Sequence, residues 1–288
     1  MPAAGSTLVH PHPLTRGTPA RTHTDASRTL QLASLPNLRD VGGLTAGDGR
    51  RVRTGLLYRS SALDRLGDED AAALARLGIR SIYDLRTEPE RAARPDRLPA
   101  GTLYVVADVV GSHAEQTPGQ IMELMRDPAV AREAFGDGKG AAMFVAHYRE
   151  FISLDSARLA LGRVFENLAD ERFRPALVHC AGGKDRTGWA VASLQLLLGV
   201  PADVVMEDFL ASNEYLGPMF GPFLDDFAAR GGDPDLIADF LWVRPPYLES
   251  ALDEMRATYG TIERYFKEGL RLDDGALRAL RVAFFEAT

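Results

Sequence analysis

The residues best suited to chemistry in this sequence are the ten from His179 to Gly188, which read His-Cys-Ala-Gly-Gly-Lys-Asp-Arg-Thr-Gly. The only cysteine of the chain, Cys180, stands second in this run, and Arg186 follows six residues later. A glycine-rich loop that leads into a helix directs backbone amides and the helix dipole at one point, which suits an anion. The same field stabilises a thiolate, so the run predicts a cysteine nucleophile inside a phosphate-binding loop.

The side chains of this loop have separate predicted roles. Cys180 attacks phosphorus and forms a phosphocysteine that water later hydrolyses, while the planar guanidinium of Arg186 binds two phosphoryl oxygens. Thr187 either hydrogen-bonds the sulfur or caps the next helix. His179 ends a buried strand and is predicted to support the loop from behind. The remaining phosphate-binding positions are Ala181, Gly182, Gly183 and Lys184.

Two carboxyl groups compete for the role of general acid toward the leaving group. Asp185 lies inside the loop, but a carboxylate beside a phosphate dianion is repelled unless it is protonated or paired with a cation. Asp108 follows a predicted strand and would act from a separate loop. We expect Asp185 to be the acid and keep Asp108 as the alternative. Arg59 is a further candidate for substrate binding.

The composition limits the classes of protein that this chain can belong to. The chain has 288 residues and a net charge of -7, which argues against nucleic-acid binding. Because it contains one cysteine, it cannot form an internal disulfide. No stretch approaches the roughly 20 apolar residues of a membrane span. Residues 1–30 are rich in proline and contain no run of about 7 to 15 apolar residues, so we predict a disordered leader without a secretory signal. The expected location is cytoplasmic, and secretion without a recognisable signal stays open as the alternative. Residues 31–288 are predicted to form one domain.

Apolar periodicity predicts strands that alternate with helices. The expected strands are 56–59, 79–85, 103–106 and 175–179, and the expected helices include 71–77, 120–132, 143–152, 159–168 and 187–198. This order indicates an α/β fold with a central, mainly parallel sheet flanked by helices, followed by a helical C-terminal third. The glycine loop then falls at the carboxyl end of a strand, where such folds bind their ligands.

Several short motifs besides the loop resemble those of the bacterial tyrosine phosphatases of the mycobacterial phosphatase B type. They are Asn37-Leu-Arg-Asp40, Tyr58-Arg-Ser-Ser61, Asp84-Leu-Arg86, Asp208-Phe-Leu-Ala-Ser-Asn213 and the region of Val243 to Leu248. The resemblance implies a phosphatase without metal or cofactor that acts on phosphotyrosine, often also on phosphoserine, phosphothreonine and phosphoinositides. It assigns the chemistry to Cys180, Lys184, Asp185 and Arg186. Between Gly111 and Gly140 the chain departs from that pattern.

Apolar residues recur at helical spacing in two stretches of the C-terminal third, from Met219 to Phe227 and from Leu236 to Leu241. The simplest interpretation is a pair of core-facing stripes. The resemblance suggests instead that residues 217–241 form a lid over the active site. Two other functions stay open, namely a phosphate-binding adaptor without turnover and a sulfurtransferase. The expected partner is a phosphorylated protein or a phosphoinositide, and the sequence does not predict an oligomeric state.

Overall fold

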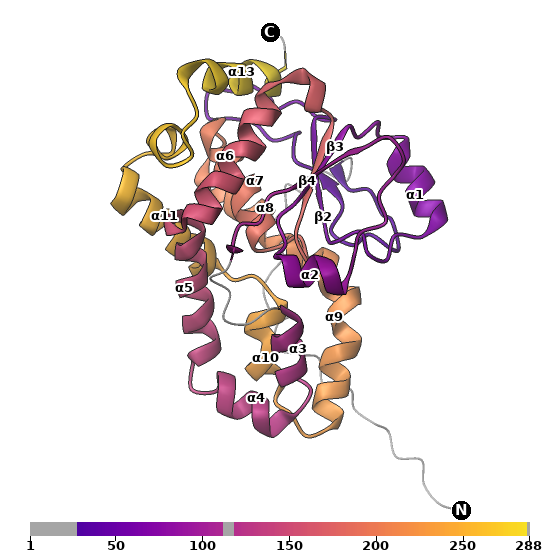
Figure 1. The fold of residues 1–288 in the computed structure, drawn as a ribbon. Coiled ribbons are helices and arrows are strands. Elements are labelled where there is room, and N and C mark those ends of the chain that lie inside the picture. Colours follow the sequence, from indigo (N-terminus) through magenta and orange to yellow (C-terminus); the bar gives the residue numbers. More distant parts are fainter. Residues whose placement is uncertain (1–27, 112–117, 287–288) are drawn as a thin grey trace, which may run out of the picture.

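A five-stranded sheet forms the centre of the computed structural model, which describes residues 28–111 and 118–286 (Figure 1). The strands are β1 (Arg39–Asp40), β2 (Leu57–Ser60), β3 (Ser81–Asp84), β4 (Leu103–Val106) and β5 (Ala176–His179). Their order across the sheet is β1-β2-β5-β3-β4, and only β1 runs antiparallel to its neighbour. The predicted α/β class and mainly parallel sheet are therefore confirmed.

The strands are short, and β2, β3 and β5 are entirely buried, as expected for the centre of a parallel sheet covered on both faces, whereas the edge strand β4 is largely exposed. Tyr58, Leu177, Ile82 and Tyr104 lie in one row across four strands. Successive residues of a strand face opposite sides, so Leu177 enters one hydrophobic core and Val178 the other. The last residues of β2, β3 and β5 end in register, which brings the segments that follow them to one edge of the sheet.

Helices connect and surround the strands. Those of the first half of the chain are α1 (Asp68–Ala75), α2 (Glu88–Ala93), α3 (Pro118–Leu124), α4 (Pro128–Phe135) and α5 (Lys139–Ser153). Those of the second half are α6 (Asp155–Ala169), α7 (Arg186–Leu197), α8 (Ala202–Leu210), α9 (Ser212–Ala229), α10 (Pro234–Leu241), α11 (Pro245–Tyr259), α12 (Ile262–Arg264) and α13 (Asp274–Phe284). Within the described part of the chain, no helix combines the length and apolar character that a membrane crossing requires.

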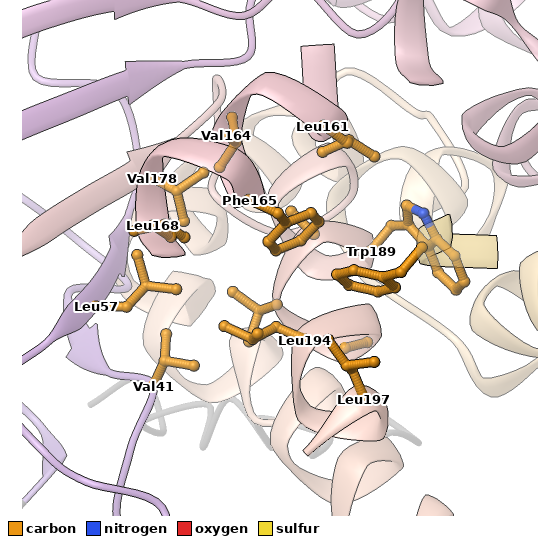
Figure 2. Packing of buried hydrophobic residues seen from close by; sticks show 14 of the residues in the cluster. Val41, Leu57, Leu161, Val164, Phe165, Leu168, Val178, Trp189, Leu194 and Leu197 are labelled. Carbon is orange, nitrogen blue, oxygen red and sulfur yellow. The ribbon is translucent and has the colours of Figure 1, made fainter. Parts of the chain in front are cut away.

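Most helices pack on one face of the sheet and form the larger core. Figure 2 shows its centre, where Leu161 and Phe165 of α6 lie beside Trp189 and Leu194 of α7, next to Val178 of the sheet. Trp189 is fully buried and its indole donates a hydrogen bond to the Tyr265 hydroxyl at 3.1 Å. Helix α1 covers the opposite face through Leu74. This packing fixes β5 and α7, the two elements on either side of the glycine loop.

Helices α3, α4, α9 and α10 form a separate group, which we call the accessory helices, with a small core of its own. That core contains Phe135, Phe227, Ile237 and Phe240, and the rings of Phe135 and Phe240 lie 4.2 Å apart. The group lies beyond α2 in Figure 1, at the same end of the molecule as the carboxyl ends of the strands. Both apolar stripes predicted in the C-terminal third thus face these helices rather than the main core.

Some sequence-based boundaries were wrong for local reasons. The single helix expected over 120–132 is two helices, because the Asp127 side chain accepts hydrogen bonds from the amides of Ala129 and Val130 and Pro128 starts α4. The end of the predicted leader belongs to the fold, since Arg28 is buried and its guanidinium contacts Asp208 at 2.9 Å. The rest of that leader, residues 1–27, lies outside the described residues.

Candidate active site

The glycine loop connects β5 to α7 and bends sharply at Gly183. This residue has a φ of +66°, and a Cβ placed on it would lie 2.0 Å from the Ser60 carbonyl oxygen at the end of β2. No other residue type fits so close to a neighbouring backbone. At Gly182, by contrast, a Cβ would meet nothing closer than the Lys184 side chain at 3.7 Å. Only the second glycine is therefore required by the shape of the loop.

The carbonyl groups of the loop are bonded outward to neighbouring elements. The Ala62 amide donates to the Ala181 carbonyl at 3.0 Å, and the Asn37 amide group donates to the carbonyls of Gly182 and Gly183 at 3.2 and 3.0 Å. None of the amides of residues 181–185 donates a hydrogen bond to a group in the described part of the chain. Unpaired amides gathered in one loop are suited to an anion as their acceptor, which is in line with the predicted phosphate-binding loop.

Arg59 lies beneath this loop rather than in a substrate pocket. It is 1% exposed, donates to the Gly183 carbonyl at 2.5 Å and lies 3.8 Å from Asp208. Burial, together with the nearby Arg39, lowers the pKa of Arg59 to about 9. This position does not support the prediction that Arg59 binds substrate, because the buried guanidinium contacts the Gly183 carbonyl of the loop from behind.

Asp208 of α8 anchors the support beneath the loop. Its carboxylate lies 2.9 Å from Arg28, 3.7 Å from Arg39 and 3.8 Å from Arg59, and all four side chains are buried. Burial alone would raise the pKa of Asp208, but the three guanidinium groups hold it well below its usual range. The sequence analysis named Asp208 only as part of a motif, because no neighbouring residue indicates that three arginines distant in the sequence contact it.

Arg186 is the first residue of α7 and is 7% exposed. Its Nη1 and Nη2 atoms donate to the two carboxylate oxygens of Glu90 in α2, at 2.6 and 2.8 Å. Burial opposes the charge, yet Glu90 raises the pKa of Arg186 above its ordinary value, so the guanidinium stays charged. Glu90 was missed by the sequence analysis. Its one local signal, a Thr87-x-x-Glu90 capping box, indicates only a helix start.

Lys184 and Asp185 form an ion pair at the rim of the loop. The Lys184 Nζ lies 2.8 and 3.0 Å from the Asp185 carboxylate oxygens, and 5.2 Å from the centre of the Phe144 ring. The Tyr148 hydroxyl donates to the same carboxylate at 2.8 Å. Burial and the Asp185 charge raise the pKa of Tyr148 well above its usual value, so it remains a donor. The loop, α5 and α7 thus meet at Asp185.

Comparisons with known proteins agree with this geometry. A model described as "Tyrosine phosphatase family" matches residues 30–286. The chain belongs to the tyrosine phosphatase family. It is 31% identical to the triple specificity protein phosphatase PtpB of Mycobacterium tuberculosis over 83% of this chain and 92% of that protein. A protein of Cupriavidus necator with a provisional tyrosine-protein phosphatase name is 29% identical over 93% of each chain. The predicted family and the predicted enzyme class, a protein-tyrosine phosphatase, are confirmed.

The alternative acid of this phosphatase, Asp108, lies in a tight turn after β4. Its Oδ1 accepts hydrogen bonds from the amides of Val110 and Gly111 at 3.1 and 2.8 Å, and its Oδ2 lies 3.9 Å from Arg91. Within the described part of the chain, Asp108 makes no hydrogen bond or ion pair with residues 179–187. Of the two carboxyl groups, only Asp185 is therefore held at the loop.

His179 takes part in a buried network behind the nucleophile. Its Nδ1 lies 3.2 Å from the Cys180 carbonyl and its Nε2 lies 3.3 Å from Asp96. Asp84, Asp96 and His179 could each offer one ligand atom to a metal ion. The Arg86 guanidinium, however, lies 2.7 Å from both carboxylates and already balances their charge. The cluster is therefore suited to supporting the loop from behind through charged and hydrogen-bonded contacts. The location of His179 agrees with its predicted place behind the loop.

Cys180 and Thr187 lie in the closed interior of the phosphatase loop. Cys180 is 2% exposed, and the Thr187 hydroxyl is buried without a partner among the described residues. Thr187 is the second residue of α7, and the N-cap position belongs to Asp185, so the capping role considered for Thr187 does not hold. Among the described residues the hydroxyl has no hydrogen-bond partner, the Cys180 sulfur included, so the other role, a hydrogen bond to the sulfur, stays a prediction.

Proposed function

We propose that this phosphatase hydrolyses phosphate monoesters through a phosphocysteine at Cys180. The observation that carries the proposal is the loop whose carbonyls are bonded outward and whose amides are unpaired around Gly183. Three phosphoryl oxygens bound to those amides place phosphorus in front of the sulfur. Cys180 Sγ then forms a bond to phosphorus while the ester oxygen leaves, and water later displaces the sulfur.

Arg186 stabilises the charge that develops on the transferred phosphoryl group. Glu90 occupies the Nη1 and Nη2 end of its guanidinium, so Nε and the outer Nη2 hydrogen remain for two phosphoryl oxygens. The Thr187 hydroxyl donates to the sulfur when it becomes the leaving group. In this arrangement Glu90 and Arg59 are positioning residues, and Cys180, Arg186 and Thr187 touch the reacting atoms.

Asp185 protonates the leaving oxygen and Lys184 balances charge at the mouth of the loop. When a phosphate dianion binds, Lys184 Nζ can pair with it, which weakens the ion pair between Lys184 and Asp185. The Tyr148 hydroxyl keeps the carboxyl group in position. The same lysine suits a second phosphate, so phosphoinositides are included as substrates. Lys184→Ala should then lower the phosphoinositide rate more than the phosphotyrosine rate.

The accessory helices form a lid over the loop. Cys180, Lys184 and Arg186 are all less than a tenth exposed, and Leu216 in the first turns of α9 would lie 3.9 Å from a Cβ on Gly182. A substrate therefore needs these helices to move before it reaches the sulfur. Faster alkylation of Cys180 after Leu216→Ala, in a protein with an unchanged circular dichroism spectrum, supports the lid. An unchanged alkylation rate contradicts it.

Hydrolysis of an aryl phosphate separates this function from an adaptor or a sulfurtransferase. The wild-type protein should hydrolyse p-nitrophenyl phosphate and Cys180→Ser should not, although it should still bind inorganic phosphate because the loop amides remain. An adaptor would bind phosphate without turnover in either form. Rates on a phosphotyrosine peptide, a phosphoserine peptide and a phosphoinositide, measured side by side, then define the substrate class.

A further inference from the structure

A cleft of about 310 Å³ lies where α2 meets the accessory helices α3 and α9. Arg94, the C-cap residue of α2, lines it. The lining also contains Arg126, just after α3, Arg230, just after α9, and the apolar residues Met122 and Phe223. The same junction is visible in Figure 1, where α2 lies next to α3 and α9. The cleft is separate from the glycine loop and has a lining of mixed charge and apolar character.

The charges of this cleft leave one guanidinium free. Arg126 pairs with Glu123 at 3.1 Å and Arg230 with Asp226 at 2.6 Å, and these four side chains are exposed. Exposed pairs of this kind contribute little and exchange partners readily. The Arg94 guanidinium has neither an ion pair nor a hydrogen bond to any residue that the structure describes. With three arginines against the two acids Glu123 and Asp226, the cleft suits one added carboxylate.

Arg94 is firmly tied to the catalytic residues through its backbone. Its amide donates to the Glu90 carbonyl at 3.0 Å, so the two residues are one helical turn, about 6 Å, apart on the same face of α2. Its carbonyl accepts a hydrogen bond from Arg86 at 2.8 Å. Glu90 binds Arg186, which is the proposed ligand of the transferred phosphoryl group. The backbone of Arg94 is therefore fixed beside the residue that binds Arg186, while Arg94 itself lines the cleft outside the phosphate loop.

We infer that this cleft binds an acidic side chain near the phosphorylated residue of a peptide substrate, and that Arg94 is the specificity-determining residue that pairs with it. Met122 and Phe223 supply an apolar wall for the methylene groups of that side chain. A net surplus of one positive charge fits a single carboxylate better than a headgroup with several phosphates. The inference rests on the proposed function, because only a bound phosphate places the peptide beside α2.

The test compares two phosphotyrosine peptides that differ only in glutamate or glutamine residues beside the phosphotyrosine. Binding is measured by fluorescence anisotropy on Cys180→Ser protein, which needs no turnover. We expect the glutamate peptide to bind several-fold more tightly, and Arg94→Gln in the same background to abolish that preference. Arg76→Gln serves as the matched control, because Arg76 is exposed on α1, away from the cleft, and should leave the preference intact.

Three outcomes overturn the inference, and a fourth concerns the proposed function alone. Equal binding of the two peptides by the parent protein, or a preference that survives Arg94→Gln, shows that the cleft does not recognise an acid. Tighter binding of a soluble phosphoinositide headgroup that is lost in Arg94→Gln would assign the cleft to lipid instead. A wild-type protein that does not hydrolyse p-nitrophenyl phosphate would refute the proposed catalysis, and the binding measurement would still report on the cleft.

Discussion

The Glu90 carboxylate binds the Arg186 guanidinium end-on, with both oxygens engaged at 2.6 and 2.8 Å. Glu90 also accepts hydrogen bonds from the amide and hydroxyl of Thr87, each at 2.9 Å, so its own position is fixed by the start of α2. The plane of the Arg186 guanidinium is therefore set by a helix that follows a different strand. In the proposed mechanism, this arrangement orients the remaining donors of Arg186 for a phosphoryl group before the substrate binds.

Replacing Glu90 should disturb the orientation of Arg186 without removing its charge. We expect Glu90→Gln to lower kcat/KM by about 10- to 100-fold, because a misplaced catalytic group costs up to about 10²-fold. Glu88→Gln is the matched control, since Glu88 is an exposed residue of the same helix. Steady-state rates on an aryl phosphate measure both. Equal rates for the two variants would show that Arg186 needs no such partner.

The two glycines of the loop should respond differently to alanine. Gly183→Ala places a Cβ 2.0 Å from the Ser60 carbonyl at a φ of +66°, so the loop must rearrange and activity should be lost. In Gly182→Ala the added Cβ makes only ordinary contacts, with Lys184 at 3.7 Å and Leu216 at 3.9 Å, and the variant should keep most activity. Activity is compared after thermal denaturation has shown both proteins to be folded. A more active Gly183→Ala than Gly182→Ala would contradict the described loop.

Asp208 should be among the most sensitive positions for stability. Asp208→Asn leaves three buried guanidinium groups without their shared anion, and we expect a loss of about 3 to 5 kcal/mol in the free energy of unfolding by urea. The lowered pKa of Asp208 means that its contribution is complete above the ordinary value of 3.8 and is lost as the pH falls through the folded value. The difference from wild type should thus shrink in acid.

The control for Asp208 is the exposed pair of Asp48 and Arg50, whose oxygen and nitrogen atoms lie 2.7 Å apart. Asp48→Asn should leave the urea midpoint unchanged, because solvent screens such pairs. If Asp208→Asn were as stable as Asp48→Asn at neutral pH, the three arginines would have to be satisfied without the carboxylate.

The pH profile of turnover should identify the general acid. Asp185→Asn cannot donate a proton, so the basic limb of the profile should flatten and the rate on a phosphate with a poor leaving group should fall by about 10²- to 10⁴-fold. The effect should be smaller for p-nitrophenyl phosphate, whose leaving group needs less protonation. Asp108→Asn should retain the wild-type profile. The reverse pattern would transfer the role to Asp108.

The sequence predicted those features that depend on neighbouring residues. Strand 103–106 has the predicted bounds, and the loop between a strand and a helix follows from its glycines and the helix signals around it. Contacts between distant segments could not be predicted in this way. Glu90 and Arg186 are 96 residues apart, and Arg28 and Asp208 are 180 apart. The position of Arg59 could not be predicted for the same reason, because its motif shows a charge but not the side of the loop on which the charge lies.

A covalent phosphoenzyme at Cys180 is the central claim, and rapid-quench trapping tests it most directly. Wild-type protein is mixed with a radiolabelled aryl phosphate, quenched within one turnover and digested. Label on the peptide that contains Cys180, absent from Cys180→Ser, is the predicted result. Rapid turnover with no label on protein, or with label on another residue, would contradict the account.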